Sequence, residues 1–510
     1  MDRHSAADEP ITPLGFLERA ATLFADRRAV VDGEREWTYR EFDDRARRQA
    51  GLLRSLGVKR GDRVAVLALN GVMLLESHYG VPLAGAALVA MNTRLSVPEL
   101  QYIVDHSRSK VLLLDEFHSH LAAKLVAPRV IAGPDYDDLL ASAPPGGEMP
   151  DDEWSLLAVD YTSGTTGRPK GVMYHHRGAY LQSLAMAFHT RLDLDSVFLW
   201  TLPMFHCNGW CFTWAVTAAG GTHLCLPRIE PGVVWEMIEH YGVTHLNAAP
   251  TVLTMLSADP AADPAKVQGV IKVATGGAPP SPALLERLGG LGMEVTHLYG
   301  LTETFGPVAI RQLAPETARL PAAERARLTS RQGGANIAAR RLRVVDDSGA
   351  DVPADGETLG QVAIRSGTVM LGYLDDEEAT RAAVPDGWFR TGDLGVMHPD
   401  GAVELRDRSK DIIISGGENI ASIEVEQALD SHPAVLESAV VGAPDDLWGE
   451  VPVAFVTLRE GADVGPEELV EHVRGRLARF KAPKRIVFGP LPKTATGKIQ
   501  KFVLREQVRG

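Results

Sequence analysis

The nonapeptide "TSGTTGRPK" (residues 162–170) combines the residue types that bind a phosphate. It contains two glycines, four hydroxyl side chains and two cations. Glycines let backbone N–H groups approach an anion, and the hydroxyls and Lys170 add donors and positive charge. Arg168 and Pro169 separate the last glycine from Lys170, which excludes the Walker pattern of a P-loop NTPase. A stretch of this composition is also typical of a solvated turn, so the motifs around it decide whether it is a phosphate site.

Four further groups of motifs follow along the chain and fit one reaction. They are "GGAPPS" (276–281), "YGLTET" (299–304), "GWFRTGDLG" (387–395) with "DRSKDIIISGGENIASIEVE" (407–426), and "PKTATGKIQK" (492–501). In this order the motifs resemble the adenylate-forming superfamily of acyl-CoA synthetases, to which adenylation domains and luciferases are related. The resemblance covers nearly the whole chain. The segments "LPMFHCNGWCFTW" (202–214), "HHRGAY" (175–180) and "ISGGENI" (414–420) are most similar to short- and medium-chain acyl-activating enzymes.

The resemblance implies a reaction in two halves. A carboxylate attacks the α-phosphorus of ATP and releases pyrophosphate, and the thiol of CoA then attacks the acyl-adenylate to give acyl-CoA and AMP. Neither half requires a nucleophile from the protein. Bringing an anion to a polyanion requires cations, Mg²⁺ and backbone donors that spread the charge of the transition state. The implied cofactors are therefore ATP, Mg²⁺ and CoA, and the implied substrate is a small carboxylic acid, either a short- or medium-chain fatty acid or an aryl acid.

The resemblance also implies roles for individual residues of the nucleotide site. Lys498 would be the catalytic lysine that contacts the carboxylate and the α-phosphate, Thr302 a donor to the α-phosphate, and Glu303 with Thr166 the ligands of Mg²⁺. Tyr299 would lie on the face of adenine. The remaining ATP-binding and AMP-binding residues would be Thr162, Ser163, Gly164, Thr165, Thr166, Gly167 and Lys170 for the phosphates, Gly276, Gly277, Ala278, Pro279 and Gly300 around adenine, and Asp393 at the ribose. Arg408 would donate to the ribose or to a phosphate. Because Lys498 acts on the reacting atoms, its loss should slow adenylation more than the loss of Lys170.

Other motifs would bind the acid and CoA. His206, Asn208 and Trp210 would belong to the acyl pocket, with His206 near the reacting carboxylate and Trp210 as a gate at the mouth of the acyl tunnel. Ser415, Gly416, Gly417 and Trp448 would contact CoA. Lys410 would be the hinge about which a C-terminal domain rotates between the two half-reactions, carrying Lys498 with it.

Several of these residues have simpler interpretations. The segment from His206 to Cys211 could be a buried aromatic wall, a metal site using Cys207, Cys211 and His206, or the location of a catalytic cysteine. Trp448 could equally be a buried core residue, given the apolar area that tryptophan buries. His175, His176 and Arg177 receive no catalytic role, since histidines on a surface or behind a site are more common than catalytic ones.

The elements that position these motifs alternate along the chain. Helical patterns at 15–25 and 41–57 alternate with apolar strands at 63–69, 110–116 and 156–162, and the alternation repeats at 243–256 and 271–288, which predicts an α/β sheet. From about residue 340, Asp-Gly turns join successive strands. We expect an α/β fold with a large N-terminal adenylation domain (1–406) that includes a β-rich subdomain (about 335–406), a hinge (407–411), and a small mobile α+β C-terminal domain (412–510).

Composition limits the partners. With 52 basic and 66 acidic residues the formal net charge is −14, which argues against general binding to nucleic acids or membranes. The sequence contains no apolar run long enough to cross a bilayer, its first residues lack the features of a secretion signal, and it has three cysteines. We therefore expect a cytoplasmic enzyme with no integral membrane segment, and the family habit suggests a homodimer.

Two other functions are compatible with some of the motifs. An adenylating enzyme could pass the activated group to an amine or a carrier protein, or could activate another oxyanion such as nitrite, rather than forming a CoA thioester. A nucleotide-binding module without catalysis would retain the fold, but the presence of Lys170, Glu303, Asp393, Arg408 and Lys498 argues against it.

Overall fold

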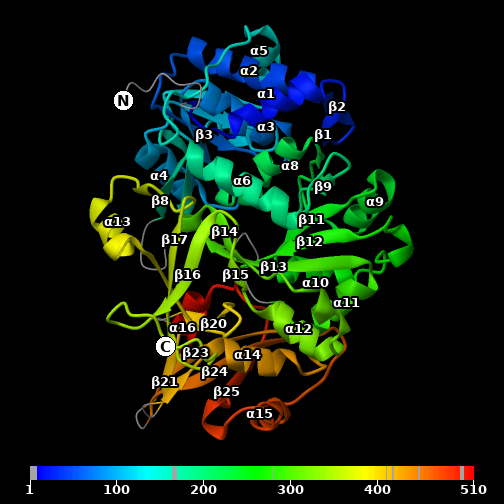
Figure 1. Cartoon of the computed structure of the whole chain (residues 1–510), viewed down its shortest axis with the longest axis vertical. Coiled ribbons are helices and arrows are strands. Elements are labelled where there is room, and N and C mark those ends of the chain that lie inside the picture. Colours follow the sequence, from blue (N-terminus) through cyan, green and yellow to red (C-terminus); the bar gives the residue numbers. More distant parts are fainter. Residues whose placement is uncertain are drawn as a thin grey trace.

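The computed structural model describes residues 9–162, 169–277, 280–408, 411–415, 418–445, 448–493 and 499–509. In Figure 1 the chain runs from the N-terminal part at the top, in blue and cyan, to the C-terminal part at the bottom, in orange and red. No helix in the described ranges is long and apolar enough to span a membrane.

A seven-stranded sheet within the described residues carries, near one edge, the two strands that flank the predicted phosphate loop. Its strands are, in spatial order, β18 (Gly372–Tyr373), β8 (Lys170–His175), β7 (Leu156–Thr162), β4 (Ala87–Ala90), β3 (Arg63–Leu67), β5 (Val111–Leu114) and β6 (Arg129–Ala132). The strands from β7 to β6 are parallel, and β8 and β18 are antiparallel additions. The helices of this part are α1 (Leu14–Leu23), α2 (Tyr39–Ser55), α3 (Val72–Leu83), α4 (Val97–Ser107), α5 (Asp135–Ser142) and α6 (His176–Thr190).

A nine-stranded sheet, counted over the same described part of the chain, carries the second set of motifs. Its order is β15 (Gly334–Ala335), β14 (Gly306–Ile310), β13 (Met293–Leu301), β12 (Ile271–Thr275), β11 (His245–Ala248), β9 (Val197–Leu199), β10 (Thr222–Leu224), β1 (Arg28–Asp32) and β2 (Arg35–Thr38). From β13 to β1 the neighbours are parallel, so their carboxyl ends share one edge. The accompanying helices are α7 (Cys207–Trp210), α8 (Phe212–Ala219), α9 (Pro231–Tyr241), α10 (Pro250–Ala258), α11 (Pro282–Gly290) and α12 (Ala322–Ser330).

The Asp-Gly-rich region forms an antiparallel sheet, as expected from its turns. The sheet consists of β16 (Ala339–Val345), β17 (Gly360–Ser366), β19 (Phe389–Met397) and β20 (Val403–Arg408), and α13 (Glu377–Ala383) lies between β18 and β19 in the chain. The short helical turns are η1 (Ser119–Leu121), η2 (Pro264–Lys266), η3 (Thr302–Thr304), η4 (Pro315–Arg319), η5 (Pro385–Gly387) and η6 (Arg479–Lys481).

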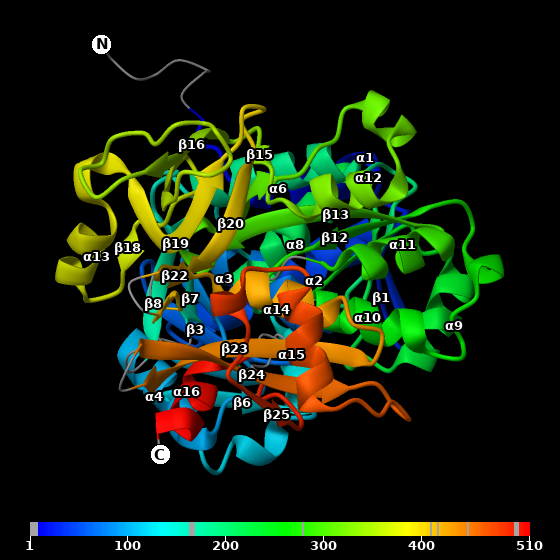
Figure 2. The same ribbon diagram turned by 90° about the horizontal axis from the view of Figure 1, so that it is seen from below.

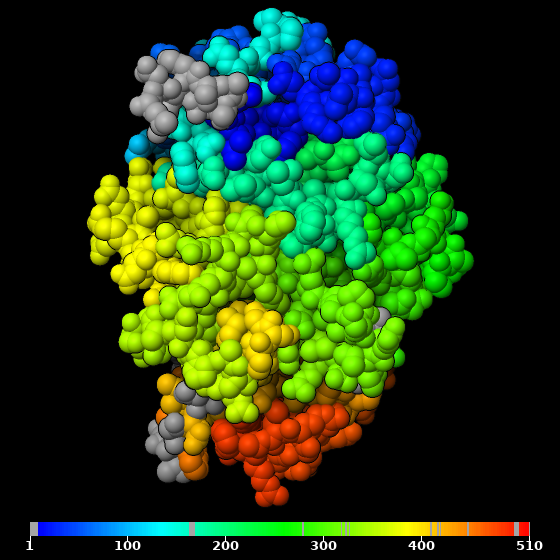
Figure 3. All heavy atoms as spheres, in the orientation of Figure 1, coloured from blue at the N-terminus to red at the C-terminus, as the bar shows by residue number. Residues whose placement is uncertain are grey.

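The C-terminal residues build a separate sheet with its own cores. The strands β22 (Glu418–Ile420), β21 (Ile413–Ser415), β24 (Gly449–Leu458) and β23 (Val435–Asp445) pair in this order, and β25 (Arg485–Phe488) pairs with β24. Helices α14 (Ser422–Asp430), α15 (Pro466–Arg474) and α16 (Lys501–Arg509) pack around it, as Figure 2 shows from below. The space-filling view shows this part at one end of the molecule (Figure 3). The fold is therefore α/β with a large N-terminal domain and a small C-terminal domain.

Local sequence explains how several elements begin. Thr38 and Glu41 form a capping box at the start of α2, and proline occupies the first turn of α9, α10 and α11, where a missing N–H costs little. The histidine pair of the "HHRGAY" motif has a similar local function. His175 caps α6 by accepting a hydrogen bond from the Gly178 backbone N–H (3.0 Å), and His176 contacts the Thr12 hydroxyl (2.8 Å). Burial lowers the pKa of both imidazoles, to about 4 and about 3, so both are neutral parts of the fold.

Candidate active site

Lys170 lies at the base of the predicted phosphate loop. Strands β7 and β8 form an antiparallel hairpin in which Thr162 and Lys170 are directly opposite each other. The Lys170 ammonium lies 3.4 Å from a carboxylate oxygen of Asp376 and 4.8 Å from the centre of the Tyr373 ring. The hairpin therefore places a cation at the first residue of β8, directly opposite the last residue of β7.

Glu303 lies in the turn η3 that follows β13, and three contacts fix this turn. The Tyr174 hydroxyl, on β8, donates to the Thr302 carbonyl (2.6 Å), and the Met370 backbone N–H donates to the Glu303 carbonyl (2.9 Å). The Tyr373 hydroxyl donates to Glu303 Oε1 (2.9 Å). Since Tyr373 also contacts Lys170, the structure brings the phosphate-loop lysine and the Glu303 turn to the same place, although they come from different sheets.

The predicted adenine and ribose residues also meet. The Tyr299 hydroxyl on β13 donates to Asp393 Oδ2 on β19 (2.7 Å), and both side chains are buried. Asp393 is opposite Arg408 in the β19–β20 ladder. This contact joins the "YGLTE" and "RTGD" motifs, so a tyrosine face and a carboxylate lie together at the end of the parallel strands, where ligands of open α/β sheets bind.

Two glycines in these motifs are required by close packing. A Cβ at Gly276, just after β12, would lie 2.9 Å from the Leu298 carbonyl oxygen. A Cβ at Gly300 would lie 2.0 Å from the Gly306 carbonyl oxygen, which is far below any real contact. Gly277 has a φ of +86°, which L side chains rarely adopt. Glycine is therefore required at these positions by the fold itself, and their contact with adenine stays a prediction.

The Glu303 carboxylate fits a magnesium ion that is shared with a nucleotide. Within the described residues its side chain accepts one hydrogen bond, from the neutral Tyr373 hydroxyl, and forms no ion pair. The described ranges contain no group of three or more His, Cys, Asp or Glu residues that could hold a metal ion by themselves. Mg²⁺ is usually held by one or two carboxylates together with substrate phosphates and water, so a single available carboxylate is the expected protein contribution.

The segment from Cys207 to Cys211 is a left-handed turn. Its φ angles are 43°, 43°, 60°, 53° and 64°, and Gly209 is its single glycine. Each non-glycine residue in this conformation costs about 1–2 kcal/mol. Strain of this kind persists where surrounding contacts enforce it, and it is typical of functional sites. Contacts with the rest of the fold must therefore hold this turn in its left-handed conformation.

Two buried residues hold this turn, and sequence reasoning did not assign them. The Asn208 backbone N–H donates to Asp160 Oδ2 (2.9 Å), and the Asn208 amide nitrogen lies 3.2 Å from His78 Nε2. His78 Nδ1 lies 2.7 Å from the Leu74 carbonyl, so Nδ1 carries the proton and Nε2 accepts from Asn208. Burial lowers the pKa of His78 to about 4, which keeps it neutral. Asp160 is an acidic residue inside the apolar stretch "LLAVDYT", a signal that could have identified it.

The left-handed turn places the Trp210 indole across the ends of the strands. A Cβ atom added to Gly276 would lie 3.2 Å from the tip of the indole. A Cβ atom added to Gly306 would lie 3.3 Å from Trp210 Cα and 3.6 Å from Trp210 Cδ1. Trp210 therefore spans from the end of β12 to the start of β14, and it is 7% exposed. It is part of the core, as the aromatic-wall interpretation holds, and it also limits the space beside the Glu303 turn.

The cysteine alternatives receive no support from the geometry. Cys207 Sγ donates to the Thr302 hydroxyl (3.8 Å) and Cys211 Sγ to the Phe305 carbonyl (3.8 Å). Burial raises the pKa of both thiols, which opposes the thiolate that a metal ligand or a nucleophile requires. The two cysteines pack the left-handed turn against η3. His206 precedes the turn and is half-buried, and its proposed role at the reacting carboxylate stays a prediction.

The remaining predicted residues lie in the C-terminal part or outside the described residues. Ser415, at the end of β21, is opposite Glu418. Trp448 is 47% exposed, so it is not a buried core residue, and it stays available for the predicted contact with CoA. The predicted residues outside the described ranges are Ser163, Gly164, Thr165, Thr166, Gly167, Ala278, Pro279, Lys410, Gly416, Gly417 and Lys498.

Comparison with known proteins identifies the family. The AMP-binding enzyme model matches residues 17–374, and the AMP-binding enzyme C-terminal domain model matches residues 424–498. The chain is 44% identical to 2-methylpropanoate–CoA ligase CCL4 of Humulus lupulus, over 99% of this chain and 96% of that protein. It is 41% identical to 4-hydroxybutyrate–CoA ligase 2 of Metallosphaera sedula, over 98% of this chain and 95% of that protein.

Solved structures support the same assignment. The anthranilate CoA ligase AuaEII in complex with anthranoyl-AMP superimposes with a TM-score of 0.89 at 26% identity, and the match covers 99% of each chain. ATP-bound MatB from Rhodopseudomonas palustris superimposes with a TM-score of 0.87 at 29% identity, over 97% of this chain and 98% of that one. The chain belongs to the AMP-binding enzyme family, and it is an acid–CoA ligase that uses ATP, Mg²⁺ and CoA to convert a carboxylic acid to its acyl-adenylate and then to its CoA thioester.

Proposed function

We propose that this ligase activates a short aliphatic carboxylic acid, of the size of acetate to 2-methylpropanoate. One observation carries this proposal: the Trp210 indole lies across the strand ends between Gly276 and Gly306. An aromatic side chain held in a strained turn cannot easily move aside for a longer chain. The relatives named acetate–CoA ligase CCL3 and 2-methylpropanoate–CoA ligase CCL4, both of Humulus lupulus, favour the same size of acid.

The roles predicted from the motifs are proposed for the residues that the structure brings together. Tyr299 would stack on adenine, and Asp393 would accept the ribose hydroxyls. Lys170 would pair with the outer phosphates, Thr302 would donate to the α-phosphate, and Glu303 would hold Mg²⁺, which spreads the charge of the phosphates when bound. These groups bind and orient the nucleotide, and the carboxylate of the acid then attacks the α-phosphorus without a protein nucleophile.

The C-terminal part would supply Lys498 for adenylation and then withdraw it. We propose the domain boundaries given by the motifs, with a hinge at 407–411 and rotation about Lys410. Accordingly, Lys498→Ala should slow adenylation more than Lys170→Ala does, and more than it slows thioester formation from supplied acyl-adenylate. A homodimer and a cytoplasmic location stay predictions. One relative, acetate/butyrate–CoA ligase AAE7 of Arabidopsis thaliana, is named as a peroxisomal protein.

A panel of acids tests the proposed substrate. Thioester formation and pyrophosphate release would be measured with acetate, 2-methylpropanoate, butyrate, hexanoate, octanoate and benzoate. We expect kcat/KM to be highest among the acids of two to four carbons. Trp210→Leu should raise the ratio of kcat/KM for hexanoate to that for acetate by about 10- to 100-fold, since each methylene in an apolar pocket is worth about 1–3 kcal/mol.

The panel also separates the proposal from its alternatives. A wild-type preference for octanoate or benzoate, or an unchanged preference in a folded Trp210→Leu variant, would contradict the proposed acid. Pyrophosphate release that does not require CoA, together with a product that is not a thioester, would favour an amine, a carrier protein or a different oxyanion as the partner in the second step.

A further inference from the structure

Residues 370–376, which we call the strap, join the two halves of the nucleotide site. At one end the Met370 backbone N–H donates to the Glu303 carbonyl (2.9 Å). Beyond it, β18 pairs with β8, and the Leu374 backbone N–H donates to the Gly171 carbonyl (2.7 Å). The strap therefore connects the strand that begins with Lys170 to the turn that contains Glu303, and no motif-based role has been given to it.

Tyr373, in the strap, has a side chain that contacts both charged residues. Its hydroxyl donates to Glu303 Oε1 (2.9 Å), and its ring centre lies 4.8 Å from the Lys170 ammonium. A phenol hydroxyl is a hydrogen-bond donor and a carboxylate accepts, so the contact fixes one oxygen of Glu303. A single side chain thus sets the orientation of the carboxylate and provides a face for the cation.

The ion pair that holds the Lys170 ammonium in this structure is weak. Its partner Asp376 lies 3.4 Å away, and both side chains are about 40% exposed, so solvent screens the ion pair. Asp376 is itself committed to α13, since its Oδ1 accepts from the Ala379 backbone N–H (2.9 Å). Lys170, Tyr373 and Asp376 line a surface pocket of about 500 Å³ that gives the ammonium room to move. Lys170 can therefore leave Asp376 for a phosphate while it stays over the tyrosine ring.

We propose that Tyr373 is a positioning residue that orients Glu303 for Mg²⁺ and keeps Lys170 beside it, so that metal and phosphate bind as one unit. This inference rests on the proposed roles of Glu303 and Lys170. A neutral hydroxyl suits the task, because it fixes one carboxylate oxygen without cancelling the negative charge that attracts the ion. Ligating carboxylates are commonly held by such hydrogen bonds, and losing the outer partner typically weakens metal binding by 10–100-fold.

The test measures metal binding directly and does not depend on turnover. Mn²⁺ serves as the probe for the Mg²⁺ site, and its binding is titrated by electron paramagnetic resonance with the enzyme saturated by α,β-methylene-ATP, which cannot be cleaved to AMP. Tyr373→Phe keeps the ring and removes the hydroxyl. We expect Mn²⁺ to bind about 10- to 100-fold more weakly to this variant. Binding of the nucleotide without metal should change by less than about 2-fold, because the ring still faces Lys170.

A second substitution separates the two functions of the side chain. Tyr373→Leu also removes the ring, so we expect the same loss of Mn²⁺ affinity and, in addition, about 2- to 5-fold weaker binding of the metal-free nucleotide. Tyr136→Phe is the matched control, because the Tyr136 hydroxyl also donates to a glutamate, Glu76, in a part of the chain that carries none of the nucleotide motifs. This control should bind Mn²⁺ as the wild type does.

The outcomes distinguish this inference from the proposed function. If Glu303→Gln lowers Mn²⁺ affinity and Tyr373→Phe leaves it unchanged, Tyr373 has no positioning role and the inference is wrong, although Glu303 keeps its role. If Glu303→Gln also leaves the affinity unchanged, the proposed role of Glu303 is wrong and the inference falls with it. An equal loss in Tyr136→Phe would mean that the effect is a general loss of structure, which also overturns the inference.

Discussion

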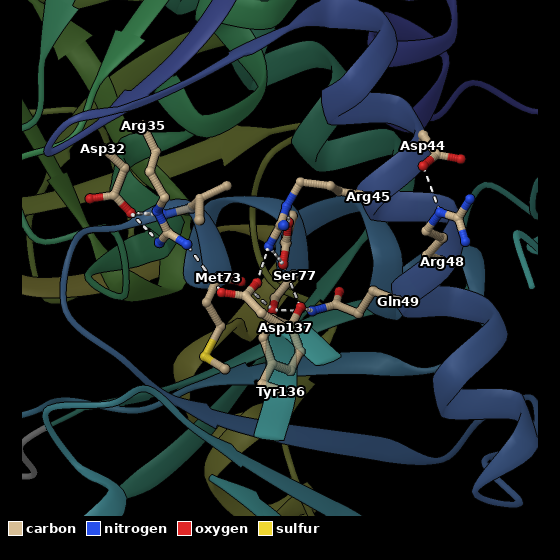
Figure 4. A network of polar contacts seen from close by, with 12 residues as sticks. Asp32, Arg35, Asp44, Arg45, Arg48, Gln49, Met73, Ser77, Tyr136 and Asp137 are labelled. Carbon is tan, nitrogen blue, oxygen red and sulfur yellow. Dashed lines mark hydrogen bonds and ion pairs between the residues drawn. The ribbon is translucent and has the colours of Figure 1, made fainter. Parts of the chain in front are cut away.

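Glu76 and Glu303 each accept a hydrogen bond from a tyrosine hydroxyl, but their surroundings differ. Glu76, on α3, is completely buried. Arg45 Nε donates to its Oε2 (2.6 Å) and Arg45 Nη2 to its Oε1 (3.1 Å), while the Tyr136 hydroxyl also donates to Oε1. Figure 4 shows Arg45, Gln49, Ser77, Tyr136 and Asp137 gathered in this polar network. Both oxygens of the buried Glu76 carboxylate therefore accept hydrogen bonds from donors on the protein.

The Glu303 carboxylate has fewer hydrogen-bond donors around it than the Glu76 carboxylate. Among the described residues, Tyr373 is the single donor to its carboxylate, and no arginine or lysine forms an ion pair with it. The carboxylate is half-buried, so it retains contact with the site. The difference suggests a way to separate structural from functional carboxylates in one chain. Glu76 is paired with a guanidinium inside the fold, whereas Glu303 has no cationic partner among the described residues, which is the arrangement that its proposed role as a Mg²⁺ ligand requires.

A third carboxyl, Asp430 at the end of α14, shows what happens when a carboxyl has a hydroxyl partner but little access to a cation. The Ser438 hydroxyl donates to Asp430 Oδ1 (2.7 Å). Burial, assisted by the nearby Glu426 and Glu437, raises the pKa of Asp430 to about 7. This carboxyl therefore keeps its proton in mildly acidic conditions. Protonation thus avoids a negative charge in the fold at Asp430, where Glu76 has an arginine partner instead.

The largest effect is expected from breaking the Glu76 pair. Arg45→Met leaves the Glu76 carboxylate buried without its cation, so the free energy of unfolding should fall by about 3–5 kcal/mol. Urea unfolding measures this loss. Thioester formation per folded molecule should be unchanged. Arg381→Met, which removes an exposed partner of Glu377, is the control and should change stability by less than about 1 kcal/mol. A stable Arg45→Met enzyme with impaired adenylation would reverse the assignment of Glu76 as structural.

The opposite pattern is expected at Glu303. Glu303→Gln keeps the shape and an acceptor for Tyr373 but removes the charge, so the rate of adenylation should fall by about 100- to 1,000-fold, equivalent to about 2.7–4 kcal/mol. The acid-dependent exchange of pyrophosphate into ATP measures this half-reaction. Because Glu303 forms no described ion pair, the unfolding free energy should change by less than about 0.5 kcal/mol. Normal exchange with a large loss of stability would place Glu303 in the same class as Glu76.

The smallest effect concerns the pH dependence of stability at Asp430. The pKa of an aspartate in the unfolded chain is about 3.9, and in the folded protein the pKa of Asp430 is raised to about 7. Its contribution to stability is therefore complete below pH ~4 and is lost as the pH rises through ~7, because the unfolded chain releases the proton first.

As the pH rises from 5.5 to 7, ionisation of Asp430 should therefore lower the free energy of unfolding of the C-terminal domain by about 1–2 kcal/mol, since each unit of pKa shift is worth about 1.4 kcal/mol. Asp430→Asn cannot titrate, so its urea midpoint should vary less with pH over this range than that of the wild type. Parallel curves for the two proteins would show that Asp430 is ionised in the fold, and a carboxyl with a hydroxyl partner would then not need a proton to be buried.

Most of the architecture could be predicted from local patterns. The strand "LLAVDYT" is β7, the apolar alternation at 271–288 is β12 followed by α11, and the Asp-Gly turns join the antiparallel strands β16, β17, β19 and β20. These elements could be predicted because hydrophobic periodicity and turn residues act over a few positions of the sequence. The division of the strands between two large sheets could not be predicted from local patterns. Strands β1 and β2 precede the strands of the seven-stranded sheet in the chain, but they pair in the nine-stranded sheet.

The site was predictable in part. Tyr299 and Asp393 were named from separate motifs, and the structure joins them by a hydrogen bond of 2.7 Å. Asp160, His78 and Tyr373 escaped prediction because each acts through another residue, and no sequence spacing connects them to it. The left-handed turn at 207–211 also escaped, because it contains a single glycine and its strain is maintained by contacts with distant segments.

What the sequence by itself determined is the chemistry of the enzyme: an ordered set of motifs whose glycines, hydroxyls, carboxylates and lysines suit a nucleotide and its metal ion. These properties belong to residue types and to short spacings, so they are present in the unfolded chain. The tertiary structure decided which carboxylate is neutralised and which is available, and where the Trp210 indole lies. Both depend on side chains that meet across different sheets, because the energy of a charge or of a buried ring is set by neighbours that the order of residues does not reveal.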